Sequence, residues 1–283
     1  MPGGSLFFGN NIYHRRYFAS HRIDWRITEN LYAGVSEAVL YGGADRTFEW
    51  EYLNPFIFYH GEQQNYKSEG NTIICADFLW FPGKRWEIYG EVMIDDMQFD
   101  KKTLAEQEPA EIGWLFGFRK ADPLGIDGME IGIEHAAITP RTYNTLQPDQ
   151  KFLHRNKPIA HPEGNDFILW MAEISKWVTP ELQVKADFTF IRKGIDSISA
   201  VFDTSFYASD DYHESFPKGI VENRFQPGLE LWYHLNHNWD FYFRGEYNFY
   251  DNYYHQEGKT EEKYLLRLGA RLDLDWNFTA PKR

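Results

Sequence analysis

The segment 167–192 alternates apolar and polar side chains with a period of two over two successive stretches. Consecutive side chains of a β-strand point to opposite faces, so this period predicts two strands, each with one apolar and one polar face. The short segment 178–181 separates the two stretches, which predicts an antiparallel hairpin with about ten residues per strand. Either protein or lipid must cover the apolar face of this hairpin. In the second stretch that face consists of Leu182, Val184, Ala186, Phe188 and Phe190.

The same alternation recurs along the chain and predicts about eleven strands. No segment shows the 3.6-residue apolar period of an amphipathic helix. Short turns and long loops alternate between the strands, and the chain is assigned to the all-β class as a single domain, residues 1–283. The long loops cover about 42–70, 96–110, 139–165 and 194–222. The apolar rows run through 17–27, 31–41, 72–80, 86–94, 112–118, 129–133, 168–174, 182–190, 229–235, 239–249 and 264–278.

Two folds would cover these apolar rows: a soluble sandwich or lipocalin-like barrel, and an outer-membrane barrel with the rows in lipid. The strand length favours the membrane barrel, because about ten tilted residues span roughly 25 Å, the height of its apolar band. Short turns on one rim and long loops on the other also favour it. So does an interfacial girdle of tryptophans near the short turns. Its members are Trp25, Trp80, Trp86, Trp177, Trp239 and Trp276.

The polar rows carry both signs of charge, so cross-strand pairing in a wet lumen would satisfy them. Arg22, Lys185, Asp187 and Arg244 are examples. Three polar residues fall instead on the expected lipid face, where a bulge, a rim position or a different register would explain them. These residues are Glu37, His135 and Glu173.

Composition excludes several other classes. The net charge of −13 argues against a nucleic-acid partner. The single cysteine, Cys75, excludes an internal disulfide framework and a multi-cysteine zinc site. The sequence contains no apolar run long enough for a transmembrane helix.

The strand count bears on how much of a barrel the chain contains. Single-chain outer-membrane barrels have an even number of strands and cannot leave an open edge in lipid. At least one further strand is therefore expected within residues 1–16 or outside this chain. Residues 1–10 also lack the pattern of a signal peptide. We therefore expect an incomplete antiparallel transmembrane β-barrel of about 11–12 strands, the C-terminal part of a longer barrel.

Five segments resemble the Wzi-type capsule assembly proteins of Gram-negative outer membranes. They are EAVLY at 37–41, EYLNPFIFYHGEQ at 51–63, the segment 89–99, FRKADP at 118–123, and the segment 141–166. The resemblance implies a larger outer-membrane barrel preceded by a periplasmic helical part, and a lectin-like role in attaching polysaccharide to the cell surface. This chain is shorter and lacks the helical part. The expected partners are capsular or exopolysaccharide and outer-membrane lipid, with the protein acting as a monomer without cofactor, metal or catalysis.

The loop 139–165 is the first candidate for polysaccharide binding, because it is the only long loop with a net positive charge. Arginine forks bind carboxylates and aromatic rings stack on sugars, so an acidic polysaccharide would suit it. Alternatively, the loop folds into the lumen as a plug and pairs its basic groups with lumen acids; both roles are compatible. The candidate contacts are Arg141, Tyr143, His154, Arg155 and Asn156.

The second candidate is the segment 49–63, where aromatic rings flanked by amide and carboxylate groups suit neutral sugars. Its candidate residues are Trp50, Tyr52, Tyr59 and His60. The alternative is an outer aromatic girdle with a rigid turn at Asn54-Pro55.

Other functions find less support in the sequence. Asp95, Asp96 and Asp100 are interpreted as a solvated strand end rather than a Ca²⁺ site or a glycosidase pair. A hydrolase that pairs Asp95 or Asp166 with His154 is a weaker alternative. A general diffusion channel with a polar lumen is the main rival to polysaccharide binding.

Overall fold

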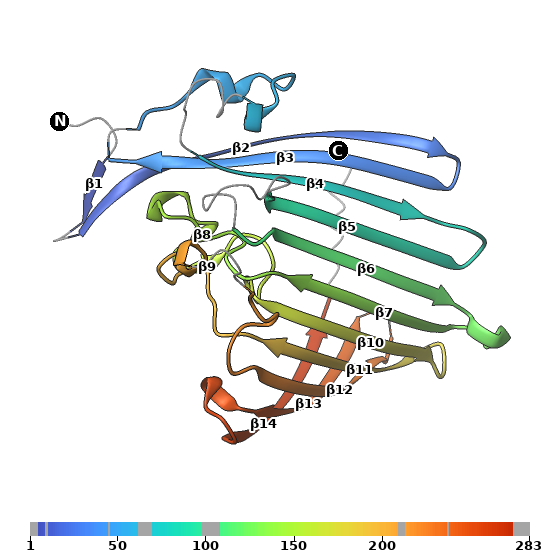
Figure 1. Cartoon of the computed structure of the whole chain (residues 1–283). Coiled ribbons are helices and arrows are strands. Elements are labelled where there is room, and N and C mark those ends of the chain that lie inside the picture. The colour runs from blue at the N-terminus through green and yellow to red at the C-terminus, as the bar shows by residue number, and fades with distance from the viewer. Residues whose placement is uncertain are drawn as a thin grey trace, which may run out of the picture.

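The computed structural model describes residues 5–8, 11–44, 46–61, 70–97, 108–208, 213–236 and 238–273. They form one antiparallel sheet of 12 strands, in which each strand pairs with its neighbours in the chain, and a separate ribbon of β8 and β9 (Figure 1). The strands are β1 (Ser5–Phe8), β2 (Asn11–Thr28), β3 (Leu31–Gly43), β4 (Asn71–Trp80), β5 (Trp86–Asp96), β6 (Glu111–Ala121), β7 (Met129–Ile138), β8 (Leu153–His154), β9 (Lys157–Pro158), β10 (Phe167–Trp177), β11 (Leu182–Lys193), β12 (Glu222–His234), β13 (Trp239–Asp251) and β14 (Thr260–Leu272).

The predicted strands are confirmed: β2 to β7 and β10 to β14 follow the apolar rows of the sequence. A further strand was expected within residues 1–16 or outside this chain, and the structure has the short strand β1 within that range. Over the described ranges the sheet is not closed, and β1 and β14 are its two edges. The end of the last apolar row, including Trp276, lies outside the described residues. The assignment to one domain of a longer barrel stays a prediction.

No helix within the described ranges is both long and apolar enough to cross a membrane.

The two faces of the sheet have the chemistry expected of a barrel wall in lipid. Phe188, Phe241 and Leu268 are 42%, 41% and 76% exposed on the outer face. On the opposite face the side chains of Asp187 and Arg244 are only 12% and 19% exposed. The all-β, outer-membrane type of fold is therefore confirmed, because a soluble sandwich would cover the apolar rows with protein instead.

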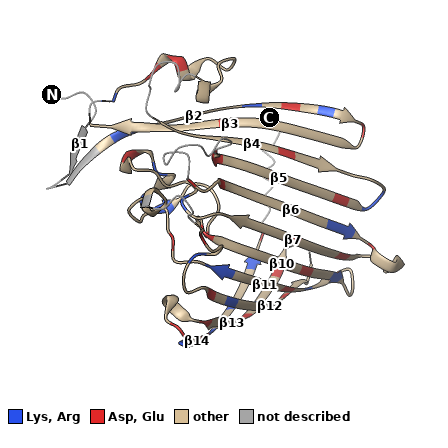
Figure 2. Cartoon of the chain, viewed as in Figure 1, with Lys and Arg blue, Asp and Glu red and all other residues tan. Residues whose placement is uncertain are grey.

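Ion pairs between neighbouring strands satisfy the charges of the inner face. The Arg244 guanidinium donates to both carboxylate oxygens of Asp187, at 2.9 and 3.1 Å, and lies 3.0 Å from a Glu246 oxygen. Lys185 pairs with Glu173 at 2.6 Å. Figure 2 shows residues of both signs side by side on β11, β12 and β13. The prediction that opposite charges pair across the lumen strands is confirmed.

This pairing corrects one detail of the sequence interpretation. Glu173 was expected on the lipid face, but it stands opposite Asp187 in the register and so points inward. His135 does lie on the outer face, where its ring stacks on Trp170 at 4.1 Å and its Nδ1 is 2.9 Å from the Leu169 carbonyl oxygen.

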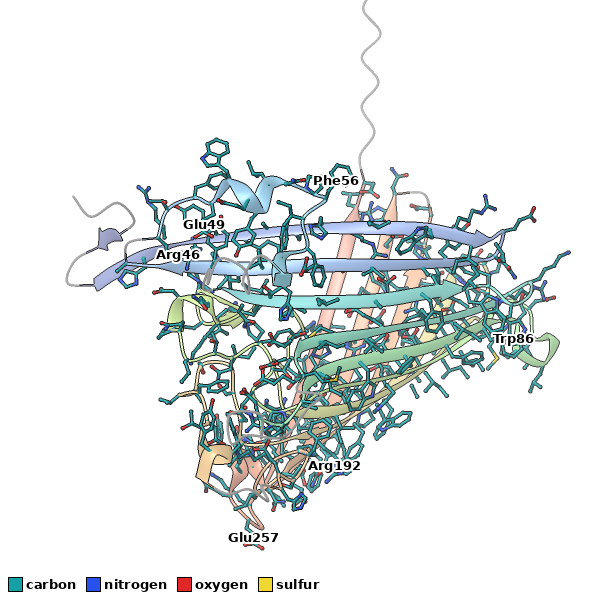
Figure 3. The ribbon with its side chains drawn as sticks, turned by 45° about the horizontal axis from the view of Figure 1, so that its top comes forward. Arg46, Glu49, Phe56, Trp86, Arg192 and Glu257 are labelled. Carbon is teal, nitrogen blue, oxygen red and sulfur yellow. The ribbon has the colours of Figure 1, made fainter. Side chains whose placement is uncertain are left out.

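The tryptophan girdle is smaller than the sequence suggested. Among the described residues, four tryptophans are exposed on the outer face near the short turns, namely Trp25, Trp80, Trp86 and Trp239. Figure 3 shows Trp86 at this rim. Trp177 was expected to join them, but it pairs with Gln183 of the inner row and stacks on His234 at 5.6 Å. A strand residue beside a turn takes its face from the register, whatever its hydrophobicity.

The inner face changes from polar to apolar toward the long-loop end. There Ile73, Met93, Ala136, Leu169 and Ile191 are buried in one cluster. The loops that follow β7 and β11 supply the other half of this cluster through Tyr143, Phe152 and Ile198. Packed loops thus cover the inner face of the strands at this end, and the two-residue alternation of the sequence breaks down here.

Candidate functional site

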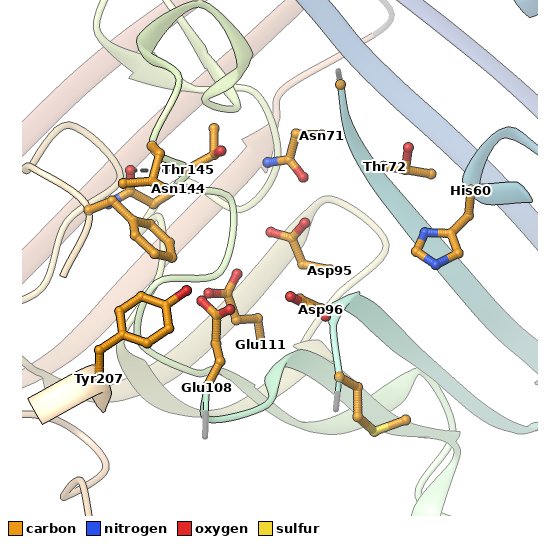
Figure 4. A pocket seen from close by; sticks show the side chains of 14 residues that line it. His60, Asn71, Thr72, Asp95, Asp96, Glu108, Glu111, Asn144, Thr145 and Tyr207 are labelled. Carbon is orange, nitrogen blue, oxygen red and sulfur yellow. Dashed lines mark hydrogen bonds between the residues drawn. The ribbon is translucent and has the colours of Figure 1, made fainter. Parts of the chain in front are cut away.

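A cavity of about 650 Å³ opens at the long-loop end of the sheet. It lies between the ends of β4, β5 and β6 and the loops that follow β7 and β11 (Figure 4). Its walls combine carboxyl groups, amides and aromatic rings, and no lysine or arginine is among the lining residues that the structure describes. The residues that give it this character are Asp95, Asp96, Glu108, Glu111, Asn71, Asn144, Phe202 and Tyr207.

Two paired strands bring the carboxyl groups together. Asp95 and Asp96 end β5, Glu111 begins β6, and the register places Asp96 opposite Glu111. Like charges directly opposite each other destabilise a sheet. Burial, together with repulsion from Asp96, raises the pKa of the loop residue Glu108 to about 7. The cavity therefore gathers carboxyl groups at an energetic cost, which is a feature of binding sites.

Asp95 is not a freely solvated strand end, contrary to the sequence interpretation. One of its carboxylate oxygens accepts a hydrogen bond from the Tyr143 backbone amide at 2.5 Å, so it anchors the loop that follows β7. Asp96 lines the cavity, and Asp100 lies outside the described residues.

A buried ion-pair network, which we call the Arg141 network, joins the two inner loops beside the cavity. Arg141 is 1% exposed and its guanidinium forms a two-point contact with the Glu214 carboxylate at 3.0 and 2.5 Å. Asp203 lies 3.7 Å from the same guanidinium, and Phe206 packs beneath it with its ring centre at 5.5 Å. Lys218 completes the network through contacts with Asp203 and with Glu214, the latter at 2.8 Å.

The network holds its acids in the charged form. Burial alone would raise the pKa of Asp203, but hydrogen bonds from Lys218 and from the Ser205 amide outweigh it and lower that pKa to about 2. The pKa of Glu214 is lowered in the same way, against burial, by hydrogen bonds from Arg141 and Lys218. These charge-assisted contacts therefore fasten the loop after β7 to the loop after β11.

The structure separates the predicted residues of the loop 139–165 into two groups. Arg141 and Tyr143 are buried at its base. His154, Arg155 and Asn156 are exposed at its tip, on the β8–β9 ribbon. The base of the loop is packed against the inner face, and Arg141 pairs there with acids of the protein itself. This is the arrangement expected if the loop acts as a plug. A ligand contact at the tip stays a prediction.

The predicted residues of the segment 49–63, apart from His60, lie on the outer face of the sheet. Tyr52 and Tyr59 are buried against Val39 and Tyr41 of β3. Trp50, at the start of the 3₁₀ helix η1 (Trp50–Leu53), is 76% exposed. Figure 3 shows this segment outside β2 and β3, with Arg46, Glu49 and Phe56 labelled. His60 is exposed at the edge of the cavity (Figure 4).

The outer segment also explains why Glu37 lies on the lipid-facing side of β3. Its carboxylate is buried and accepts hydrogen bonds from the backbone amides of Tyr59 and His60, at 2.7 and 2.8 Å. His21 of β2 lies 3.4 Å away. The acid is therefore covered by protein rather than by hydrocarbon, and neither a bulge nor a rim position is needed to accommodate it.

Replacing Glu37 with alanine is expected to loosen this outer segment by about 3 kcal/mol, because two hydrogen bonds to a charged acceptor are lost. Trypsin cleavage after Arg46 in outer-membrane vesicles measures the loosening and should accelerate. Glu51→Ala, at an exposed position of the same segment, is the matched control and should leave the rate unchanged. An unchanged rate in the Glu37 variant would contradict the assigned role.

Sequence reasoning missed Glu108, Glu111, Asn144 and Tyr207 as cavity residues. One signal was available: acids stand at both ends of the connection 96–110, and a hairpin brings those ends together. The contributions of Asn144 and Tyr207 depend on how the two inner loops pack, for which the sequence has no local signal.

Comparisons with known proteins identify a family for this chain and two solved structures that resemble it. The sequence profile of the family described as capsule assembly protein Wzi matches residues 4–263. Among solved structures, the outer membrane channel DcaP of Acinetobacter baumannii is similar with a TM-score of 0.49 and 10% identity, over 89% of this chain and 61% of that chain. The NanC porin is similar with a TM-score of 0.36 and 9% identity, over 92% of this chain and 98% of that one. This chain thus spans less than two thirds of the channel's length, and the comparison with curated proteins finds no match.

Proposed function

Because the chain belongs to the capsule assembly protein Wzi family, we propose that it binds capsular or exported polysaccharide at the cell surface and holds it there. The protein is located in the bacterial outer membrane. Long loops of outer-membrane barrels face the outside of the cell, so the cavity at the long-loop end would open toward the capsule.

The composition of the cavity is the observation that carries this proposal. Carboxylates and amide oxygens accept hydrogen bonds from sugar hydroxyls, and the rings of Phe202 and Tyr207 offer faces on which a sugar can stack. Its volume of about 650 Å³ lies within the usual range for ligand pockets, roughly 300–1,000 Å³.

A non-catalytic role is part of the proposal. The hydrolase alternative needs Asp95 or Asp166 to act with His154. Asp166 accepts hydrogen bonds from the backbone amides of Asp196 and Lys218, at 2.9 and 3.0 Å, and Asp95 accepts one from Tyr143. His154 is exposed on β8. Both carboxylates thus accept hydrogen bonds from the backbone of the loops and stabilise their conformation. This structural role favours a binding protein over a hydrolase.

Surface retention of polysaccharide tests the proposal. Tyr207→Ala, expressed in a strain that lacks the native gene, should release more polymer into the medium, since one stacking face is worth about 1 kcal/mol, or roughly fivefold in affinity. Tyr254→Ala, an exposed tyrosine of the loop between β13 and β14, is the matched control. The proposal fails if deleting the gene itself leaves the retained and released amounts unchanged.

A further inference from the structure

We propose that the cavity recognises a sugar unit carrying a free ammonium group, and that it excludes acidic sugars such as uronic acids. The inference rests on the proposed function and names the chemical class of polymer that the protein holds. It reverses the expectation from the sequence, in which the positive loop 139–165 suggested an acidic polysaccharide.

The positive charges of that loop are not presented to the cavity. Arg141 is buried in the Arg141 network against Glu214. Lys151 is buried too and donates to the Ala200 carbonyl oxygen. The titratable groups that the described walls of the cavity do present are four carboxyl groups, Asp95, Asp96, Glu108 and Glu111. A uronic acid in this space would add a further negative charge to a low-dielectric site, which is unfavourable.

Glu111 supplies a second and separate observation. Glu111 is 3% exposed and lines the cavity. Its Oε1 has no hydrogen-bond donor within the described structure. The Nε of Arg141 lies 3.9 Å from this oxygen, beyond hydrogen-bond distance. A buried acceptor without a donor costs free energy, and a donor brought by a ligand would recover that cost. An ammonium group is such a donor, and its positive charge also favours the ionised form of this buried carboxyl group over the neutral one.

The aromatic rings place the rest of the sugar. Figure 4 shows Tyr207 and Asn144 on one side of the cavity, with Glu108 and Glu111 between them and the strand ends that carry Asp95 and Asp96. A pyranose whose apolar face lies on the Tyr207 ring therefore points its substituents toward the acids. A ring face beside a group of carboxyls is complementary to an amino sugar in both shape and charge.

Three oligosaccharides of equal length and different charge test the inference by isothermal titration calorimetry on the full chain in detergent. They are the hexamers of glucosamine, N-acetylglucosamine and galacturonic acid, compared where glucosamine is protonated. We expect the glucosamine hexamer to bind at least tenfold more tightly than the neutral hexamer, and the galacturonic acid hexamer not to bind. Equal affinity for the first two, or tighter binding of galacturonate, would overturn the inference.

Variants separate this cavity from general attraction to a protein of net charge −13. Glu111→Gln and Glu108→Gln keep the side-chain shape and should each weaken glucosamine-hexamer binding about tenfold. Glu257→Gln, in the exposed loop before β14, is the matched control and should not weaken it. If all three variants bind like the native protein, the ammonium site is not this cavity.

The organism's own extracted polysaccharide distinguishes failure of the inference from failure of the proposed function. If it binds the native protein and both cavity variants equally, the protein holds polysaccharide elsewhere and only the inference falls. If it does not bind the native protein at all, the proposed function falls and the inference falls with it.

Discussion

Replacing Arg141 with methionine should release the two inner loops from each other and destabilise their packing by about 3–5 kcal/mol. Methionine fills part of the same volume, but among the described residues it leaves Glu111 without a cation beside it and Glu214 with Lys218 alone. An uncompensated buried carboxylate is costly, so the loops are expected to leave the inner face rather than repack in place. The expected result is a wider passage through the barrel at an unchanged strand content.

Bilayer conductance measures this change and also decides between the polysaccharide-binding and diffusion-channel alternatives. A barrel whose inner face is covered by loops should be nearly silent, whereas Arg141→Met should show steady conductance steps. Arg155→Met removes an exposed arginine from the tip of the same loop and should stay silent. Large steps in the native protein would favour the channel alternative, and silence in the Arg141 variant would show that the Arg141 network does not hold the loops in place.

Replacing Phe188 with arginine should destabilise the protein by about 2–4 kcal/mol, although Phe188 is 42% exposed to whatever surrounds the barrel. Phe188 lies midway along β11 on the outer face. Placing a guanidinium at this position costs little free energy in water but much in hydrocarbon. The size of the destabilisation therefore reports which medium surrounds the outer face. Urea unfolding in lipid vesicles, followed by tryptophan fluorescence, measures the difference.

The neighbouring residue offers a matched control for the lipid face. Thr189 follows Phe188 directly and points to the inner face, so Thr189→Arg adds the same charge on the wet side of the same strand. It should cost much less than Phe188→Arg. Equal costs for the two variants would mean that lipid does not cover the outer face, and the assignment of the two faces would have to be abandoned.

Local periodicity was sufficient to predict the strands and, over their middle portions, the face of each residue. Asp187 and Phe188 show why. Successive side chains of a strand point to opposite faces, and in mid-strand all residues of one face share the same polar or apolar environment. At the strand ends this uniformity fails. Trp177, the last residue of β10, was assigned to the wrong face, since the register of pairing, which hydrophobicity does not report, decides the face there. Glu173 was also misassigned, although it lies in mid-strand, where the alternation with Ala172 and Ile174 already places it on the inner face.

The candidate site was less predictable than the fold. Arg141 was recognised as notable but was expected at a binding surface, whereas its partner Glu214 is 73 positions away in another long loop. Asp95 and Asp96 were seen in the sequence, but Glu111 became relevant only through its place opposite Asp96. Which charges pair with each other, and which are left to line a cavity, depends on contacts between segments that are far apart in the chain.

The sequence by itself determined that this chain forms an antiparallel sheet of outer-membrane type, since the two-residue period and the alternation of short and long connections are local properties of the chain. Only the tertiary structure decided that the positive loop is fastened against the inner face of the sheet and that an acidic cavity opens beside it. The physical reason is that a buried charge takes its role from the groups that surround it, and those groups are assembled by the packing of distant loops.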